Sequence, residues 1–306
     1  MINVLLIGYG SIGKRHFKIL CSLAKITLVH VVTRQQINGV PSYPQLDALN
    51  KEQLEKYDVF LICTETNKHA EQLKYIDERV KGKLIIVEKP LFSVSMLYTP
   101  LNRVLVAYNL RFHPVIQQLK RLLADEKILT YNVLVGQYLP SWRPEQDYRQ
   151  SYSSDINRGG GVLRDLSHEI DYTMMFCGEL NVVGAISSKV SNLDINADDV
   201  CLLLCRSGGG AIVSLHLDYL AFQPKRSIDI QTHAMTISAD LINNKMSVYT
   251  NNDKVLYDFS DYDQDYSYNQ MHINAIEQSA DEMCSYQEAN QIMSLIDQIT
   301  NNYMDI

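Results

Sequence analysis

Three glycines near the start of the chain place the strongest constraint on its fold. They are Gly8, Gly10 and Gly13. An apolar run typical of a buried parallel strand, residues 4–7, precedes them, and a helical pattern begins at Ser11 and Ile12. In such a turn the first glycine permits a tight bend, the second lets a diphosphate approach the backbone, and the third lets the helix pack against the strand. The sequence therefore predicts a dinucleotide site, with the phosphates bound by N–H groups at the start of the helix.

Two other interpretations of this turn stay open. A methyltransferase also has a glycine-rich turn after its first strand, and a plain strand-to-helix turn can contain three glycines without binding a ligand. The position of the turn, between a strand and a helix, favours the dinucleotide.

The composition of the 306-residue chain narrows the partners that we expect. A net charge of −7 argues against nucleic acid, and no apolar run is long enough to span a bilayer or to suggest a signal peptide. The six cysteines form no Cys-x-x-Cys pair and the histidines form no His-x-x-x-His pair, so we expect reduced thiols and no metal site. The sequence thus predicts a cytoplasmic protein with a small-molecule substrate, and neither a nucleic-acid nor a membrane partner.

The end of the second predicted strand, residues 26–32, bears on the choice of cofactor. An NAD enzyme commonly has an acidic residue here that binds the ribose hydroxyls. This chain instead has Thr33 and Arg34. Because a guanidinium offers a planar fork of donors to phosphate, we expect NADP rather than NAD. A solvated Arg34, or one stacked on the adenine, is the alternative.

Two further apolar runs, residues 59–63 and 84–87, have the length of buried strands. The first leads to Thr64 and His69, and the second leads to Glu88, Lys89 and Pro90. Ligands of open parallel sheets bind outside the carboxyl ends of the strands. We therefore expect these residues and the glycine turn to line one crevice.

The second half of the chain has a different pattern. Strand-like runs follow one another with few helices between them, which is typical of a largely antiparallel sheet. These runs cover residues 129–138, 182–190, 200–205, 211–217, 227–232, 234–239 and 255–259, and two helices are expected at 264–283 and 286–303. The sequence predicts an α/β protein with two domains, a dinucleotide-binding Rossmann domain over 1–115 and a substrate-binding α/β domain over 116–306.

A helix is predicted after the glycine triplet 159–161, and it carries polar residues at helical spacing. Asp165, His168 and Tyr172 are three and four residues apart, so one continuous helix would place them on one face. A histidine beside a carboxylate suits proton transfer near neutral pH, and hydride transfer to or from a nicotinamide needs such a partner. A histidine packed in a polar interface is the alternative.

The polar, aromatic loop over residues 139–149 is a candidate substrate site. It contains Trp142, which offers a stacking surface, and Arg143 and Arg149, which are suited to pairing with a carboxylate or phosphate. A loop folded over an interface is the alternative.

These motifs resemble those of the glucose–fructose oxidoreductase, inositol dehydrogenase and MocA (Gfo/Idh/MocA) family. The resemblance lies in Gly8-x-Gly10-x-x-Gly13, Cys63-Thr64-x-Thr66-x-x-His69, Glu88-Lys89-Pro90, and the glycine triplet followed by Asp165 and His168. It implies an open, mostly antiparallel C-terminal sheet whose free face forms a homodimer or homotetramer.

The resemblance also implies roles for individual residues. Lys89 would contact the nicotinamide ribose and the substrate hydroxyl, and the bond to Pro90 is often cis. His168 would be the acid/base, and Asp165 would orient the substrate or His168. The chain departs from the family at two places: the usual Asp-x-x-x-His becomes Asp-x-x-His here, and the acidic residue after the second strand is missing.

The loop over 138–149 together with the segment 165–171 looks like a bacterial subgroup associated with surface sugars, including sialic-acid-like ones. The resemblance therefore implies an NAD(P)-dependent oxidoreductase acting on a CH–OH or carbonyl group of a sugar, sugar acid or nucleotide sugar, in surface polysaccharide biosynthesis. An NAD(P)-binding regulatory protein that has lost catalysis is the alternative.

Overall fold

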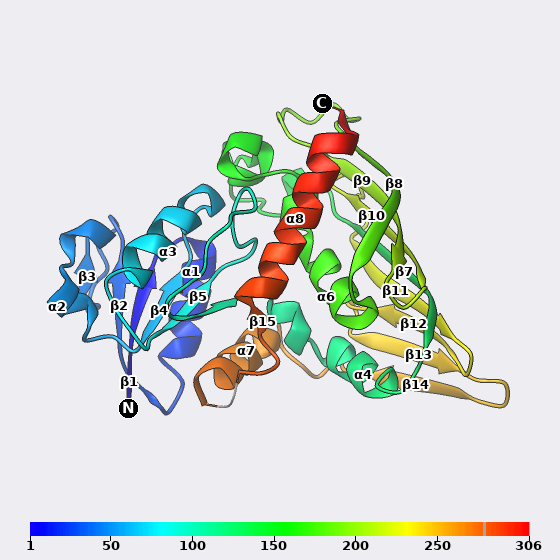
Figure 1. Ribbon diagram of the computed structural model, residues 1–306, viewed down its shortest axis with the longest axis horizontal. Helices are drawn as coiled ribbons and strands as arrows, with labels where there is room; N and C mark the ends of the chain where they lie inside the picture. The colour runs from blue at the N-terminus through cyan, green and yellow to red at the C-terminus, as the bar shows by residue number, and fades with distance from the viewer. Residues whose placement is uncertain (278–279, 306) are drawn as a thin grey trace. The chain divides into compact units, whose positions relative to one another are not determined.

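The computed structural model describes residues 1–277 and 280–305. The chain forms two compact units, each with its own sheet (Figure 1). Unit 1 consists of residues 1–109 and 265–293, and unit 2 of residues 110–264 and 294–306. The predicted α/β class, with an N-terminal Rossmann domain and a mostly antiparallel C-terminal sheet, is confirmed.

Unit 1 contains, within the described residues, a seven-stranded sheet in the order β15-β6-β5-β4-β1-β2-β3. Its strands are β1 (Ile2–Ile7), β2 (Ile26–Val32), β3 (Ser42–Tyr43), β4 (Val59–Ile62), β5 (Leu84–Val87), β6 (Arg103–Val106) and β15 (Cys284–Ser285). All pairs are parallel except β15 with β6. Because β5, β4 and β1 are parallel neighbours, the residues that follow them lie at one edge of the sheet, as the sequence predicts.

Unit 1 also contains helices. They are α1 (Ser11–Leu20), α2 (Lys51–Leu54), α3 (His69–Asp77) and α7 (Tyr266–Glu277), with short 3-10 turns at Leu46–Ala48 and Thr66–Lys68. Helix α1 packs on β1, β2 and α7, and α3 packs on β4 and β5. The helix expected over 264–283 is α7, and residues 278 and 279 of that range lie outside the described part of the chain.

The connection from β5 to β6, residues 88–102, contains no helix although every residue of it is described. Asp77 at the end of α3 anchors it by accepting hydrogen bonds from the Tyr98 hydroxyl (2.5 Å) and from the amides of Leu101 and Asn102 (2.8 Å each). The Asp77 carboxylate thereby holds this connection in place without a crossover helix.

Unit 2 contains a nine-stranded sheet in the described residues, in the order β14-β13-β12-β11-β7-β10-β9-β8-β16. The strands are β7 (Ile128–Gly136), β8 (Leu180–Ser188), β9 (Val200–Ser207), β10 (Ile212–Asp218), β11 (Lys225–Thr232), β12 (Thr236–Asp240), β13 (Lys245–Tyr249), β14 (Lys254–Asp258) and β16 (Met304–Asp305). Pairs β7–β10 and β8–β16 are parallel, and the others are antiparallel. Strand β13 was not predicted, although its short sequence alternates buried Met246 and Val248 with more exposed neighbours.

One face of this sheet carries helices. They are α4 (Pro114–Leu122), α5 (Val162–Asp165) and α6 (Ser167–Cys177), and α8 (Tyr286–Tyr303) runs from unit 1 into unit 2. Short 3-10 turns lie at 109–112, 139–141, 148–150, 152–154 and 156–158. Figure 1 shows α4 and α6 on the same side of the sheet.

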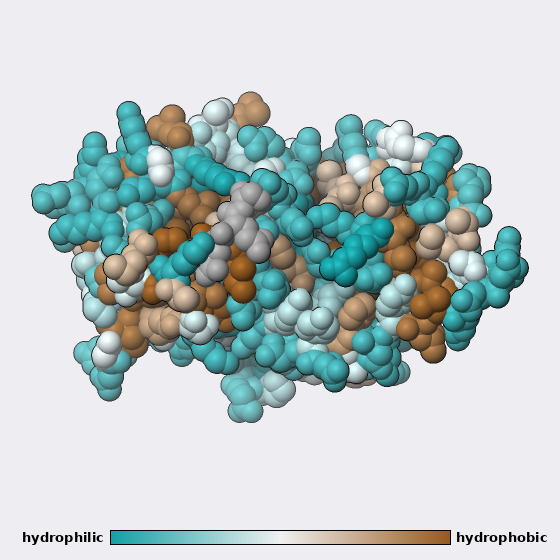
Figure 2. Space-filling model, turned by 90° about the horizontal axis from the view of Figure 1, so that it is seen from below, coloured by the Kyte–Doolittle hydropathy of each residue, from teal (hydrophilic) through white to brown (hydrophobic). Residues whose placement is uncertain are grey.

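The other face of the sheet exposes apolar side chains. In β9, Cys201, Leu203 and Cys205 are buried, whereas Leu202 and Leu204 between them are 40% and 46% exposed. Exposed apolar residues elsewhere are interspersed with hydrophilic ones, as the side of the molecule in Figure 2 illustrates.

Candidate functional site

Contacts around the glycine turn explain why two of its positions require glycine. Gly8 has a φ of +100°, and a Cβ there would lie 2.7 Å from the carbonyl oxygen of Cys63. A Cβ on Gly13 would lie 2.3 Å from the carbonyl oxygen of Gly8. A Cβ on Gly10, in contrast, would meet no described atom within 4 Å, and no side chain caps the helix that begins at Ser11. Open space beside uncapped helix N–H groups fits a bound diphosphate.

The loop after β2 lies beside this turn. The side-chain amide of Gln35 donates to the carbonyl oxygen of Tyr9 (3.1 Å), and the Gln35 backbone N–H donates to the hydroxyl of Thr33 (3.1 Å). Arg34 is exposed. Thr33 therefore orders the loop, while the Arg34 guanidinium is accessible beside the glycine turn.

His69 connects the loops that follow β4 and β5. Its Nε2 lies 3.1 Å from the carbonyl oxygen of Thr64, and its Nδ1 lies 3.1 Å from that of Pro90. Burial lowers the pKa of His69, and the carbonyl oxygens oppose this shift. The ring is 1% exposed, so in this arrangement it holds the two loops together.

Lys89 is half-buried directly after Glu88, and its bond to Pro90 is cis, as the resemblance implies. Glu88 itself is 6% exposed and bonds to the protein: Oε1 lies 2.7 Å from His16 Nε2, and Oε2 accepts a 3.0 Å hydrogen bond from the Lys89 amide. The sequence alone indicated no such partner for Glu88.

The expectation that one continuous helix carries Asp165, His168 and Tyr172 is wrong. The helix is interrupted at Leu166 (φ −96°, ψ 28°), so Asp165 ends α5 and His168 lies on α6. Asp165 Oδ2 accepts a 2.7 Å hydrogen bond from the buried hydroxyl of Tyr219. Burial and the nearby Asp165 raise the pKa of Tyr219, which keeps the phenol a neutral donor.

The start of α5 is held by a buried acid that the sequence did not single out. Asp198 accepts a 3.0 Å hydrogen bond from the Leu163 amide, and a Cβ on Gly161 would lie 2.0 Å from Asp198 Oδ1. Burial raises the pKa of Asp198 to about 6, although the Leu163 amide and Arg164 oppose the shift. The last glycine of the triplet is therefore needed for close packing against this carboxyl group.

Two ion pairs, each with a buried carboxylate, hold the part of α6 that follows His168. Arg111 donates to Asp171 through Nε (3.0 Å) and Nη2 (2.7 Å). Arg226 Nε lies 2.8 Å from Glu169 Oε1, which also accepts from the Tyr172 hydroxyl (3.1 Å). Tyr172 is fully buried. These pairs were not predicted, because their partners are far apart in sequence.

The aromatic loop packs on the same part of unit 2. The Trp142 indole N–H donates to the carbonyl oxygen of Gln137 (3.0 Å), and its ring meets that of Tyr219 edge to face at 5.1 Å. Arg149 pairs with Asp147, with Nε and Nη2 each within 2.9 Å of a carboxylate oxygen. Arg143 is exposed and lines a small cavity together with Trp142.

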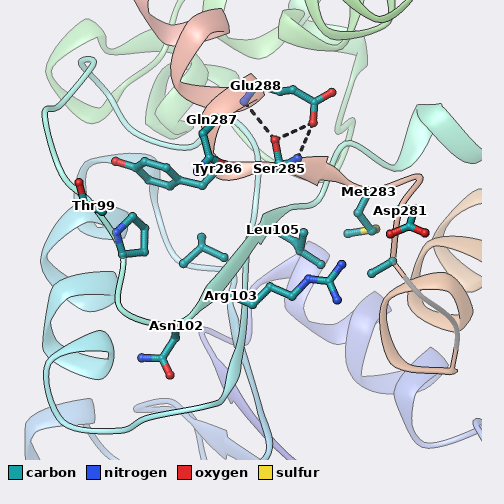
Figure 3. Close-up of a pocket in the computed structure, with 13 residues that line it drawn as sticks. Thr99, Asn102, Arg103, Leu105, Asp281, Met283, Ser285, Tyr286, Gln287 and Glu288 are labelled. Carbon is teal, nitrogen blue, oxygen red and sulfur yellow. Dashed lines mark hydrogen bonds between the residues drawn. The ribbon is translucent and has the colours of Figure 1, made fainter.

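A cavity of about 400 Å³ lies beside β6 and β15 in unit 1 (Figure 3). Arg103, Asp281 and Tyr286 line it, and Glu288 in its wall accepts hydrogen bonds from the amide (2.8 Å) and hydroxyl (2.7 Å) of Ser285. None of the residues predicted to bind cofactor or substrate is among the described residues around it.

Two family profiles match the chain. The oxidoreductase family with an NAD-binding Rossmann fold matches residues 2–102, and the Gfo/Idh/MocA C-terminal domain matches residues 116–238. The chain belongs to the Gfo/Idh/MocA family of oxidoreductases. The family resemblance, the dinucleotide-binding Rossmann domain and the enzyme class expected from the sequence are thus confirmed.

Solved structures share the fold of this Gfo/Idh/MocA chain. Levoglucosan dehydrogenase in complex with NADH is 17% identical with a TM-score of 0.83, over 98% of this chain and 96% of that one. UDP-N-acetylglucosamine 3-dehydrogenase GnnA from Acidithiobacillus ferrooxidans is 16% identical with a TM-score of 0.77, over 99% and 97%. No curated protein sequence is significantly similar to this chain. Across residues 1–277 and 280–305, no helix combines the length and the apolar character needed to span a membrane.

Proposed function

We propose that this oxidoreductase transfers a hydride between a nicotinamide cofactor and a hydroxyl or carbonyl group of a sugar, sugar acid or nucleotide sugar. The observation that carries the proposal is the open space at Gly10, next to the uncapped start of α1, at the sheet edge where Lys89 follows β5. The similar folds of a levoglucosan and a UDP-N-acetylglucosamine dehydrogenase support the sugar class. More specifically, we propose that the enzyme acts in surface polysaccharide biosynthesis.

In this proposal residues 1–115 bind the cofactor, which supplies or accepts the hydride when bound. The glycine turn binds the diphosphate, and the loop after β2 binds the adenosine end. The residues proposed to bind the cofactor are Gly8, Gly10, Ser11, Ile12, Gly13, Thr33, Arg34, Thr64, His69, Glu88, Lys89 and Pro90.

Lys89 and His168 have separate roles. The Lys89 ammonium contacts the nicotinamide ribose and holds the substrate oxygen. His168 exchanges the proton of that oxygen, because imidazole gains and loses a proton near neutral pH. Asp165, fixed by Tyr219, orients the substrate or His168.

Residues 116–306 bind the substrate in this proposal. Trp142 provides a surface for stacking on a sugar ring, and Arg143 pairs with an anionic group such as a carboxylate or phosphate. The Arg149 guanidinium binds the substrate only by leaving its ion pair with Asp147. Tyr172 acts indirectly, through its hydrogen bond to Glu169.

We also propose that the cofactor is NADP. The exposed guanidinium of Arg34 beside the glycine turn supports this choice, because it offers donors to a 2′-phosphate. Titration of the protein with NADPH and NADH tests it. We expect tighter binding of NADPH and a loss of that preference in Arg34→Ala, whereas a preference for NADH would contradict the choice of NADP alone.

Turnover assays test the main proposal. The substrates are hexoses, sugar acids and UDP-sugars, each with NAD(H) and NADP(H). Lys89→Met should lower kcat by about 100-fold or more while cofactor affinity changes little. Lys83→Met is the matched control, since Lys83 precedes the same strand at its other end, where its ammonium donates to the backbone carbonyl oxygen of Glu55 (3.0 Å). Equal turnover in Lys89→Met and the parent protein would contradict the assignment, and cofactor binding with no turnover of any substrate would favour the regulatory protein.

A further inference from the structure

A chain of hydrogen bonds that the proposed reaction does not use leads through the interior of unit 1. His272 on α7 lies with Nε2 2.7 Å from Nδ1 of His16 on α1, and His16 Nε2 lies 2.7 Å from Glu88 Oε1. The other oxygen of Glu88 accepts from the Lys89 amide at 3.0 Å. Both histidines are 0% exposed, so water does not compete for these bonds.

The far end of the chain fixes the direction of the bonds. Nδ1 of His272 is buried and has no hydrogen-bond partner among the described residues. A buried N–H without an acceptor is rarer and more costly than a bare acceptor, so the proton of His272 belongs on Nε2. Burial, reinforced by His16, lowers the pKa of His272 well below its usual value, which keeps this ring neutral with a single N–H.

The remaining protons follow from this one. His272 Nε2–H donates to His16 Nδ1, which must then be an acceptor. The proton of His16 is therefore on Nε2, from which it is donated to Glu88. Glu88 accepts at both oxygens, which suits an ionised carboxylate, and a buried carboxylate needs such donors to offset its lost hydration.

The groups around the chain leave Glu88 no other strong donor in the described structure. Cys63 is buried beside it, and burial together with Glu88 raises the pKa of that thiol. His69 faces backbone carbonyls. Tyr268 packs its ring edge to face on His16 at 5.4 Å, outside the chain of hydrogen bonds.

We propose that His272 and His16 are positioning residues for the function proposed above, on which this inference rests. They deliver one N–H to Glu88 and so hold the carboxylate that fixes the backbone of Lys89. Without the N–H of His272 the His16 ring is held only at Nε2, so the donor to Glu88 is no longer fixed in position and the turn that carries Lys89 is freed. His272 thus sets the position of Lys89 without contact to substrate or cofactor.

A pair of variants at one position tests the role. In His272→Gln the amide nitrogen takes the place of Nε2 and can still donate to His16, whereas His272→Phe fills the space without a donor. We expect His272→Phe to lower kcat about tenfold or more with KM changed by less than about threefold, and His272→Gln to keep at least about half of the wild-type kcat. Tyr268→Phe, which contacts the His16 ring outside the chain, should stay within about twofold of wild type.

Equal kcat in the Gln and Phe variants, whether unchanged or lowered, would overturn the positioning role. A second measurement does not depend on the variants folding. Nitrogen-15 NMR of histidine-labelled wild-type protein should show both rings with the proton on Nε2, and a proton on Nδ1 of His272 or a doubly protonated His16 would overturn the inference alone. A wild-type protein that binds cofactor but turns over no sugar would instead overturn the proposed function, together with the role built on it.

Discussion

The hydroxyl of Tyr219 donates a 2.7 Å hydrogen bond to Asp165, and both side chains are buried. The Trp142 ring packs edge to face on Tyr219. A continuous contact therefore leads from the aromatic loop to the carboxylate that ends α5, one residue before the break at Leu166. A substitution of Trp142, Tyr219 or Asp165 should therefore alter the packing or hydrogen bonding of the other two residues.

Removal of the Tyr219 hydroxyl should destabilise unit 2. In Tyr219→Phe the buried carboxylate of Asp165 loses a donor, and we expect the free energy of unfolding to fall by about 1–3 kcal/mol. Urea unfolding followed by circular dichroism measures this change. Tyr138→Phe is the control, because the Tyr138 hydroxyl has no hydrogen-bond partner in the described chain, and it should change stability by less than about 0.5 kcal/mol. Equal effects in the two variants would contradict the importance of the Tyr219–Asp165 bond.

Two glycines of the first turn should respond differently to alanine. Gly10 has a φ of −73° with open space around a Cβ, so Gly10→Ala should keep its melting temperature yet bind NADPH and NADH at least about tenfold more weakly. Gly13→Ala places a methyl group against the carbonyl oxygen of Gly8 and should lower stability by about 1–3 kcal/mol. Differential scanning fluorimetry and cofactor titration distinguish the two effects. Unchanged cofactor affinity in Gly10→Ala would argue against a diphosphate at this turn.

His113 should make the protein sensitive to acid. It is the N-cap of α4, where its Nδ1 accepts the Val115 amide (3.3 Å), and burial together with Arg226 lowers its pKa to about 4. The unfolded chain takes up a proton near pH 6.5 and the folded protein only near pH 4, so the stability that the neutral ring contributes is present above about pH 6.5 and lost as the pH falls through about 4.

The variant His113→Asn keeps a good N-cap without a titrating group. Across the window from about pH 6.5 to 4, the wild type should lose up to about 3 kcal/mol relative to this variant. Chemical unfolding of both proteins at pH 4, 5, 6 and 7 measures the difference. Parallel stability curves over this range would show that His113 does not titrate as its burial requires.

The free face of the nine-stranded sheet should bind a second copy of the chain. Leu204 is 46% exposed in the middle of β9, and Leu202 on the same strand and its register partner Ile186 on β8 are also exposed. Leu204→Asp places a charge in this apolar face and should convert a dimer or tetramer into a monomer. Sedimentation velocity measures the change, with the fully exposed Leu97 of unit 1 changed to Asp as the control. A monomeric wild type, or an unchanged assembly in Leu204→Asp, would contradict this interface.

The sequence predicts the first sheet well because its signals are local. Strands β1, β4 and β5 are short apolar runs with all or most residues buried, and Gly8 and Gly13 are required by close backbone contacts next to β1. The family motifs lie on the same strand ends.

The sequence fails where distant contacts decide the structure. The stretch from Val162 to Cys177 contains no glycine or proline and is helical in pattern throughout, yet it breaks at Leu166. Asp198 at the start of α5 and Tyr219 at its end hold the short helix, and neither is visible from local periodicity. His16 and His272 are 256 residues apart, so no spacing rule could pair them.

Unit 1 is built from two segments that are far apart in the sequence, and this affects its folding during synthesis on the ribosome. Domains generally fold as units, the N-terminal one first, while translation continues. Here α7 and β15 come after nearly all the strands of unit 2, so α1 lacks its packing partner and β6 remains an open edge while those strands emerge. An open edge can pair with another strand, and the strands of unit 2 are the nearest available. The nascent chain must therefore keep its first sheet unfinished, and free of wrong partners, until translation is almost complete.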